Sequence, residues 1–337
     1  MDENHPLLSH QIKLVNALSP QFINITVITS QVSKKILLPN NVQVLNVNWK
    51  NKQNFRNAIR FYKLTLPVLF RKRNAVVFSH MTEAYSLLIG PFTTLLKLKH
   101  ILWYAHKSQS WKLRLAYPFI SIILTSTAGS CPIKSKKVFC IGQGIQTEIF
   151  SPKQPPHELT HFVHVGRFDK SKRIDVLIDA LVEMRKSNPQ LTLELIGETA
   201  DKESIIWAEK VRIGNQKNLD KGWLKFSGNI PRERLPRILH NKDIFIHAFI
   251  GSLDKTLIEA TLTKLPVLTE NIEYRSIFGS WSDKADSNLL DEYQSLLKLS
   301  RPEISSELHR RYQIAVKEHS FENWVHQIVY FIKSQRV

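Results

Sequence analysis

Apolar and polar positions along the chain define two kinds of segment that follow one another regularly. Short runs rich in Val, Ile and Thr predict buried strands, and segments with apolar residues at a period of about 3.6 predict amphipathic helices. Short strands separated by about 10–15 residues are typical of βαβ units and a mostly parallel sheet. Up to residue 150 the predicted strands are 23–29, 42–47, 75–79, 100–104 and 120–125, and the predicted helices are 8–18, 55–69, 83–98 and 111–117.

The second half of the chain repeats this order. Several of its predicted strands are almost uninterrupted apolar runs, which is typical of a parallel sheet with helices on both faces. A long helical region, about 303–333, closes the chain. The other predicted strands are 160–166, 191–196, 224–228, 244–248 and 266–269, and the other predicted helices are 174–186, 232–239 and 253–262.

A proline-rich connector divides the two halves. Pro152, Pro155 and Pro156 make a stiff, non-helical segment. We therefore predict two doubly wound α/β domains, 1–150 and 151–337, that face a cleft, with the last helix packing back on the first domain. The first domain shows no opening strand before its helix at about residue 8, so either that strand is absent or the recorded start is too late.

The charge is distributed unevenly between these halves. The formal net charge is +18, and residues 1–150 carry 19 basic against 4 acidic side chains, whereas residues 151–337 carry 28 against 25. A basic half indicates an anionic partner: nucleic acid, an anionic membrane surface or a phosphorylated substrate. Two cysteines exclude a disulfide scaffold and fit a reducing compartment. The apolar run 115–124 contains Pro118 and predicts a buried strand rather than a membrane span.

The first candidate site lies where the strand 160–166 passes into a helix. Gly166 allows close backbone approach, and Arg167 and Lys172 can converge on one anion. Guanidinium and ammonium groups at the carboxyl end of a sheet suit a diphosphate. The alternative interpretation is a solvated basic loop before a helix.

The second candidate site follows the strand 244–248. Gly251 and Ser252 form a turn into a helix, where free backbone N–H groups and the helix dipole attract anions. Lys255 would strengthen this site, and Asp254 would oppose it unless a cation such as Lys255 pairs with it. Glu259 is suited to accept hydrogen bonds from sugar hydroxyls, as acidic residues do for ribose in Rossmann folds; alternatively it is a surface residue of the helix.

Together the two segments resemble the carboxyl-terminal domain of glycosyltransferase family 4 (group 1), which comprises retaining enzymes with the GT-B fold. Arg167 and Lys172 match a Gly-Arg and a Lys five positions later, which grip the donor diphosphate in that family. Glu259, followed by Ala260 and a Pro-Val strand, matches the second half of its Glu-x7-Glu pattern and is thereby implied to bind the donor ribose. Gly251 stands where the family has the first Glu, and Asp254 is the candidate substitute.

The same resemblance implies further site residues. His106 ends a strand and is implied to face the donor sugar across the cleft, and His80 is a second candidate on the acceptor side. The segment 140–150 resembles the family's interdomain segment, with Gln143 and Gln146 in place of Asn and Asp. The implied catalytic residues are His106, Arg167, Lys172 and Glu259, and the implied donor-binding residues are Gly166, Ile230, Gly251, Ser252, Leu253, Asp254, Lys255 and Thr256.

The predicted function is retaining transfer of a sugar from a nucleotide-diphosphate sugar to an acceptor hydroxyl, with a lipid-linked or cell-surface glycan as the expected acceptor. We expect no metal or other cofactor, because no paired Asp motif or His/Cys cluster is present. The basic stretch 55–73 is either an amphipathic helix at the inner face of a membrane or a solvated helix with its apolar face in the core. The expected location is cytoplasmic. The alternatives are a GT-B-fold nucleotide-sugar epimerase, a non-catalytic nucleotide-sugar or membrane-binding module, and a nucleic-acid-binding protein, which no recognition module supports.

Overall fold

The computed structural model describes residues 9–32, 37–50, 52–71 and 74–334. Helices and strands alternate through the first half of the chain, as the sequence predicts. Its helices are α1 (Ser9–Leu18), α2 (Asn54–Arg71), α3 (Glu83–Leu95) and α4 (Trp111–Ala116), and its strands are β1 (Ile25–Thr29), β2 (Val42–Asn46), β3 (Val76–His80), β4 (Lys99–Trp103), β5 (Ile122–Thr125) and β6 (Val138–Cys140).

The strands of the first half form two separate parallel sheets. β1 pairs with β2, and β3, β4, β5 and β6 pair in that order. β1 and β3 are not hydrogen-bonded neighbours, yet Ile25 of β1 and Phe78 of β3 pack against the same apolar cluster. The two sheets therefore belong to one layer of the fold.

The second half contains the remaining elements. Its strands are β7 (His161–Val165), β8 (Thr192–Ile196), β9 (Leu224–Ser227), β10 (Ile244–His247) and β11 (Val267–Thr269). Its helices are α5 (Ile174–Ser187), α6 (Lys202–Gly214), α7 (Gln216–Asp220), α8 (Leu235–His240), α9 (Lys255–Leu262), α10 (Ile272–Phe278), α11 (Leu289–Lys298), α12 (Arg301–His319) and α13 (Phe321–Lys333).

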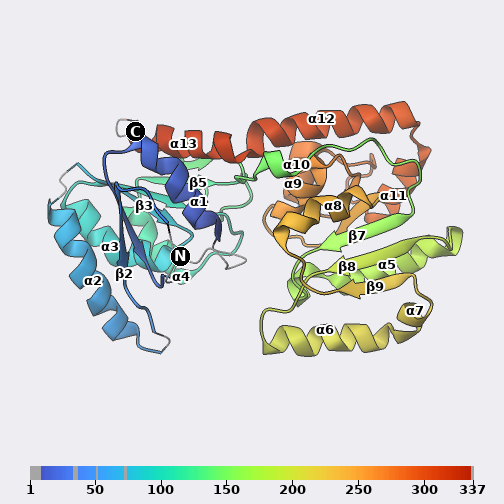
Figure 1. Ribbon diagram of the computed structural model, residues 1–337, viewed down its shortest axis with the longest axis horizontal. Helices are drawn as coiled ribbons and strands as arrows, with labels where there is room; N and C mark the ends of the chain where they lie inside the picture. The colour runs from blue at the N-terminus through green and yellow to red at the C-terminus, as the bar shows by residue number, and fades with distance from the viewer. Residues whose placement is uncertain (1–8, 33–36, 51, 72–73, 335–337) are drawn as a thin grey trace.

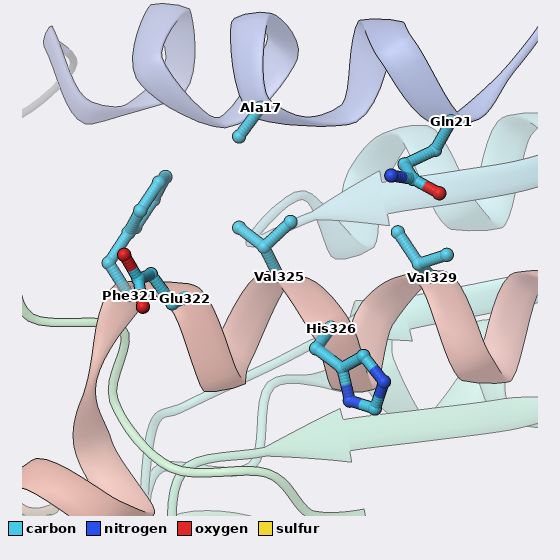
Figure 2. A pocket seen from close by; sticks show the side chains of 7 residues that line it. All are labelled: Ala17, Gln21, Phe321, Glu322, Val325, His326 and Val329. Atoms are coloured by element: carbon cyan, nitrogen blue, oxygen red, sulfur yellow. The ribbon is translucent and has the colours of Figure 1, made fainter.

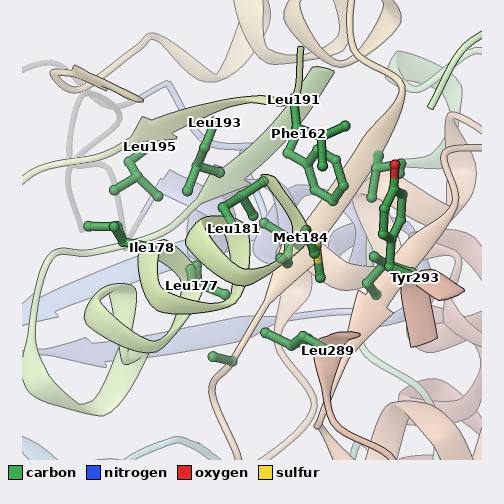
Figure 3. Close-up of a cluster of buried hydrophobic side chains, with 14 of the residues drawn as sticks. Phe162, Leu177, Ile178, Leu181, Met184, Leu191, Leu193, Leu195, Leu289 and Tyr293 are labelled. Carbon is green, nitrogen blue, oxygen red and sulfur yellow. The ribbon is translucent and has the colours of Figure 1, made fainter. Parts of the chain in front are cut away.

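These five strands form one parallel sheet in the order β11-β10-β7-β8-β9. This is the strand order of a Rossmann fold, with the first strand of the half in the middle. The sequence of α5 explains why this helix packs on the sheet as a layer. Apolar residues recur on one face of the helix and are buried there: Ile174, Leu177, Ile178, Leu181 and Met184. Figure 3 shows this face packed against side chains of β7 and β8.

The last two helices connect the halves. α12 runs along the second half and α13 along the first (Figure 1). Trp324, Ile328 and Phe331 of α13 are buried in a cluster with Leu14 and Ile101 of the first half. The carboxyl-terminal helix is therefore part of the core of the amino-terminal half.

Several sequence predictions need correction. The helical region 303–333 is interrupted at Ser320, which has an extended backbone (φ −63°, ψ 149°) because the residues on either side of it hydrogen-bond the backbone of Ile145. Only the end of the apolar run 115–124 enters a strand, since its first part lies in α4 and a 3-10 turn. The sequence analysis missed β6, α6, α7, α10 and α11. Among the described residues, no helix has both the length and the apolar character that crossing a membrane requires.

Candidate active site

Two loops meet at the switch point of the second-half sheet. β7 and β10 are neighbours, and the chain continues from β7 to β8 on one side and from β10 to β11 on the other. Ligands of open α/β sheets bind at such a point, outside the carboxyl ends of the strands. Residues 166–173 follow β7 and residues 248–254 follow β10, so the two candidate segments lie at the same edge.

Glycines bring the ends of β7 and β8 close together. Gly197 has φ +155°, and a Cβ on it would lie 1.8 Å from the carbonyl oxygen of Gly166. A Cβ on Gly166 would in turn lie 2.9 Å from Nε2 of His164. This close approach fixes the backbone from which Arg167 extends toward solvent.

Lys172 is the best-buried cation of the site. It is 8% exposed, and its ammonium lies 4.0 Å from the centroid of the Phe249 ring. It donates a hydrogen bond to the carboxylate of Asp254, so the loop after β7 and the loop after β10 are joined by an ion pair. Burial alone would raise the pKa of Asp254, but Lys172 and His247 outweigh it and hold that pKa well below its usual range.

Two histidines lie beneath this pair. Nε2 of His247 lies 3.4 Å from the Asp254 carboxylate, and His164 packs beside it with ring centroids 5.8 Å apart. Burial lowers the pKa of His247, and it lowers the pKa of His164 to about 3. Both rings are therefore neutral near pH 7, so the positive charge beside Asp254 comes from Lys172 rather than from the histidines.

The turn at Gly251 is shaped by Phe249. A Cβ on Gly251 would lie 2.0 Å from Cζ of the Phe249 ring. A larger residue at this position would displace the ring from beneath Lys172. The sequence thus replaces the expected carboxylate at 251 with an aromatic face and a carboxylate three residues later.

The amino terminus of α9 carries anion-binding groups that other side chains do not occupy. Asp254 is the N-cap residue, but its side chain does not cap the helix because it binds Lys172 and His247 instead. Between the described residues, no hydrogen bond or ion pair is found for the Lys255 ammonium, and the buried Thr256 hydroxyl has no partner. Uncapped N–H groups, a hydroxyl and an ammonium converge here, while Ser252 precedes them in the turn.

Leu253 is the most buried of the predicted donor-binding residues. Its side chain is 1% exposed, its N–H donates to Oγ of Ser130, and its carbonyl accepts from the Gln143 amide. Leu253 therefore ties α9 to the first half of the chain. Gln143 lies in the segment that resembles the family's interdomain segment, so the sequence contained a signal for this contact.

A second contact between the halves was not predicted. The buried carboxylate of Glu273 accepts hydrogen bonds from Oγ1 of Thr127 at 2.7 Å and from the N–H of Gly129 at 2.9 Å. A glutamate in the first turn of a helix has no sequence feature that distinguishes it from a solvated residue. Only the fold brings it to the first half.

Glu259 is buried and already paired. Its side chain is 2% exposed and accepts a hydrogen bond from Arg232, whose side chain is 45% exposed. Burial raises the pKa of Glu259, and the charges of Arg232 and Lys255 oppose this shift. Ile230 lies partly buried against the same core as α9. Glu259 is therefore a buried carboxylate rather than a surface residue, and the sequence analysis missed Arg232 as its partner.

Arg167 and His106 approach each other from the two halves. Arg167 is exposed, and its guanidinium lies 3.5 Å from Asp169. Burial lowers the pKa of His106; Glu83 raises it, and Arg167 lowers it further. Arg167 of the second half therefore acts electrostatically on a histidine of the first half. His80 instead packs edge-on to Trp324, with ring centroids 6.1 Å apart.

Two pockets lie elsewhere in the molecule. One, of about 310 Å³, lies between α1 and α13, where Val325 lies opposite Ala17 and Val329 opposite Gln21 (Figure 2). The other, of about 520 Å³, lies where the halves meet and includes Cys140 and Glu273. Within the described ranges, no three His, Cys, Asp or Glu residues are grouped as metal ligands.

Comparison with known proteins identifies the class. Residues 145–282 match the family described as "Glycosyl transferases group 1". No curated protein matches the sequence. The second half of the chain therefore contains a group 1 glycosyltransferase domain, as the motifs predicted.

Solved structures define the fold of the whole chain. Anabaena HepE in complex with UDP and glucose is similar with a TM-score of 0.74 and 13% identity, over 99% of this chain and 98% of that chain. A Rickettsia africae glycosyltransferase is similar with a TM-score of 0.74 and 14% identity, over 99% and 97%. The lipopolysaccharide outer core galactosyltransferase WaaB, in its apo form, is similar with a TM-score of 0.69 and 13% identity, over 97% of each chain. The predicted GT-B fold is confirmed.

Proposed function

We propose that this glycosyltransferase moves a sugar from a nucleotide-diphosphate sugar to an acceptor hydroxyl and retains the anomeric configuration. The observation that carries the proposal is the pair of cations Lys172 and Lys255 at the uncapped start of α9, which also carries the buried carboxylate of Glu259, while Arg167 lies on the same loop as Lys172. Cations at a helix amino terminus suit a diphosphate, and a buried carboxylate suits ribose hydroxyls. The UDP in the HepE complex supports this choice of ligand class.

The cluster can accelerate transfer by stabilising the leaving group. The bond between the anomeric carbon and the diphosphate oxygen breaks, and the acceptor oxygen bonds to the same face of the sugar. Arg167, Lys172 and Lys255 neutralise the charge that accumulates on the diphosphate, and preorganised charge of this kind is usually a large part of catalysis. The departing phosphate oxygen accepts the proton of the acceptor hydroxyl, so the reaction needs no separate base.

His106 would act from the opposite wall. Its lowered pKa keeps the imidazole neutral near pH 7. A neutral ring can hydrogen-bond a sugar hydroxyl or a phosphate oxygen without adding charge. We assign it a role in orienting the donor.

We propose that the reaction requires no divalent metal, because fixed cations take the place that a metal has in other diphosphate sites. Turnover should then be unchanged in excess EDTA. Activity that disappears with EDTA and returns with Mg²⁺ or Mn²⁺ would contradict this proposal.

The acceptor is proposed to be a lipid-linked or cell-surface glycan at the cytoplasmic face of a membrane. α2 buries Phe61 and Leu69 in the core but exposes Phe55, Ile59 and Phe70. Arg56 and Lys63 are exposed on the same helix. Exposed apolar residues beside cations are typical of surfaces that bind anionic membranes.

The test is turnover of a panel of nucleotide-diphosphate sugars, with products analysed with and without an acceptor. Arg167→Ala should reduce turnover, whereas Lys170→Ala, which removes a neighbouring exposed cation paired with Glu203, should not. Equal turnover by both variants would refute the proposed site. A changed sugar without any transfer would instead indicate an epimerase.

A further inference from the structure

The cations of the candidate active site already have internal counter-ions. Arg167 lies 3.5 Å from Asp169, Lys172 binds Asp254, and Arg232 binds Glu259. Lys255 alone among these four cations has no ion pair with any described residue. A diphosphate that enters the site therefore meets carboxylates as well as cations.

The Asp254 carboxylate is the best anchored of these counter-ions. Its side chain is 17% exposed, and its Oδ2 interacts with both Lys172 and His247. Nδ1 of His247 lies 3.3 Å from Oγ1 of Thr269, which itself accepts the N–H of Asn271 at 3.1 Å. The ionised Asp254 carboxylate can only accept a hydrogen bond, so the proton of the neutral ring is on Nε2 and points to Asp254, and Nδ1 accepts from the Thr269 hydroxyl.

Asp254 also occupies the position where an anion is expected. It is the N-cap residue of α9, and its carboxylate lies on the buried ammonium of Lys172 rather than on the helix N–H groups. A donor phosphate at this helix start would compete with that carboxylate for Lys172 and be repelled by its charge.

We propose that Asp254 is an internal counter-ion that sets the donor affinity of this enzyme, because a nucleotide diphosphate gains Lys172 only by exchange with the Asp254 carboxylate. This inference rests on the proposed donor site. Lys255 lies near the charges of Glu259 and Asp254 but forms no ion pair with a described residue, so it makes the first contact with the incoming diphosphate. Lys172 joins when negative charge increases on the leaving group, so part of the binding interaction is reserved for the transition state.

The test is the affinity of Asp254→Asn for inorganic pyrophosphate and for UDP, ADP and GDP, measured by titration calorimetry at low and high salt. The amide keeps the shape and accepts the Lys172 hydrogen bond but lacks the charge. We expect at least one nucleoside diphosphate and pyrophosphate to bind about tenfold more tightly, as removal of one opposing charged hydrogen bond predicts. When Asp254→Asn is combined with Lys172→Met, it should increase the affinity by a smaller factor than it does in the wild type.

The matched control is Asp179→Asn, which removes one negative charge from the exposed face of α5 and should leave every affinity unchanged. Asp254→Ser, which supplies a good N-cap residue, repeats the test if the asparagine variant does not fold. If the wild type binds these ligands and Asp254→Asn binds them equally or more weakly, this inference is overturned, but the proposed function is not. Folded wild type and variants that all fail to bind these ligands would overturn both.

Discussion

The two halves of the protein share one architecture but differ in how their charged side chains are paired. The ion pairs found between described residues all join side chains of residues 161–311. In the first half the described carboxylates, Glu83 and Glu148, accept hydrogen bonds from Ser110 and Gln146. The described cations of the first half therefore have no acidic partner within ion-pair distance, whereas many of the described cations of the second half are organised into ion pairs.

This difference indicates two kinds of anion binding. Unpaired surface cations attract a large anionic partner at little structural cost and are screened by salt. A buried paired cation such as Lys172 is held in a fixed geometry by its carboxylate, and it can bind one small anion only in exchange for that carboxylate. The first property suits a membrane or an anionic acceptor, and the second suits a diphosphate.

The largest expected effect comes from the buried cation of the second half. Lys172→Met should lower kcat/KM by about 10³-fold, because it removes a preorganised charge from the leaving group. Steady-state kinetics with the preferred donor measures the change, and Lys170→Met is the control on the same loop. A loss below tenfold in a folded variant would assign catalysis to Lys255 and Arg167 instead.

The ion pair between Glu194 and Lys242 should have a smaller effect, which is on the stability of the fold and is present only above an acidic pH. Burial raises the pKa of Glu194, but Lys242, Ser227 and Lys225 together lower it to about 2. Because the folded pKa lies below the unfolded value, this stabilisation is complete above about pH 4.5 and is lost as the pH falls toward 2.

Glu194→Gln should accordingly reduce the free energy of unfolding at pH 7 by about 3 kcal/mol and have little effect near pH 2. Urea denaturation at a series of pH values provides the measurement. A destabilisation that does not change with pH would show that packing, rather than charge, is responsible.

The proposed contact between Glu259 and the donor ribose should have a smaller effect, which depends on the ligand. Glu259→Gln should weaken nucleoside diphosphate binding about tenfold, because an amide is a weaker acceptor for ribose hydroxyls than a carboxylate. Pyrophosphate, which has no ribose, should bind the variant and the wild type alike. Equal weakening of both ligands would mean that Glu259 acts by holding Arg232.

The smallest effect is expected on the surface of the first half. Arg56→Gln on α2 should weaken binding to anionic vesicles about fivefold at low salt, since one cation near such a surface contributes about 1 kcal/mol. Flotation with vesicles rich in phosphatidylserine measures it, and Lys217→Gln on α7 of the second half is the control. Equal binding by both variants would remove α2 from the proposed membrane surface.

The sequence allowed the fold to be predicted wherever apolar periodicity was strong. The predicted strand 244–248 and the predicted helix 174–186 match β10 and α5 within one residue at each end. The break at Ser320 escaped prediction because it depends on backbone hydrogen bonds to Ile145, which is distant in the chain. Helices such as α6, whose apolar residues Ile205 and Ile213 are exposed, lack the one-sided apolar pattern that predicts a packed helix.

The sequence by itself determined the alternation of strands and helices, the unequal charge of the halves, and the segments that carry Arg167, Lys172 and Glu259. These properties follow from residue type and local spacing. The tertiary structure alone decided that Asp254 pairs with Lys172, that Arg232 covers Glu259, and that Glu273 and Gln143 join the halves. Each of those contacts connects residues distant in the chain, because a parallel sheet brings the ends of separate strands to one edge.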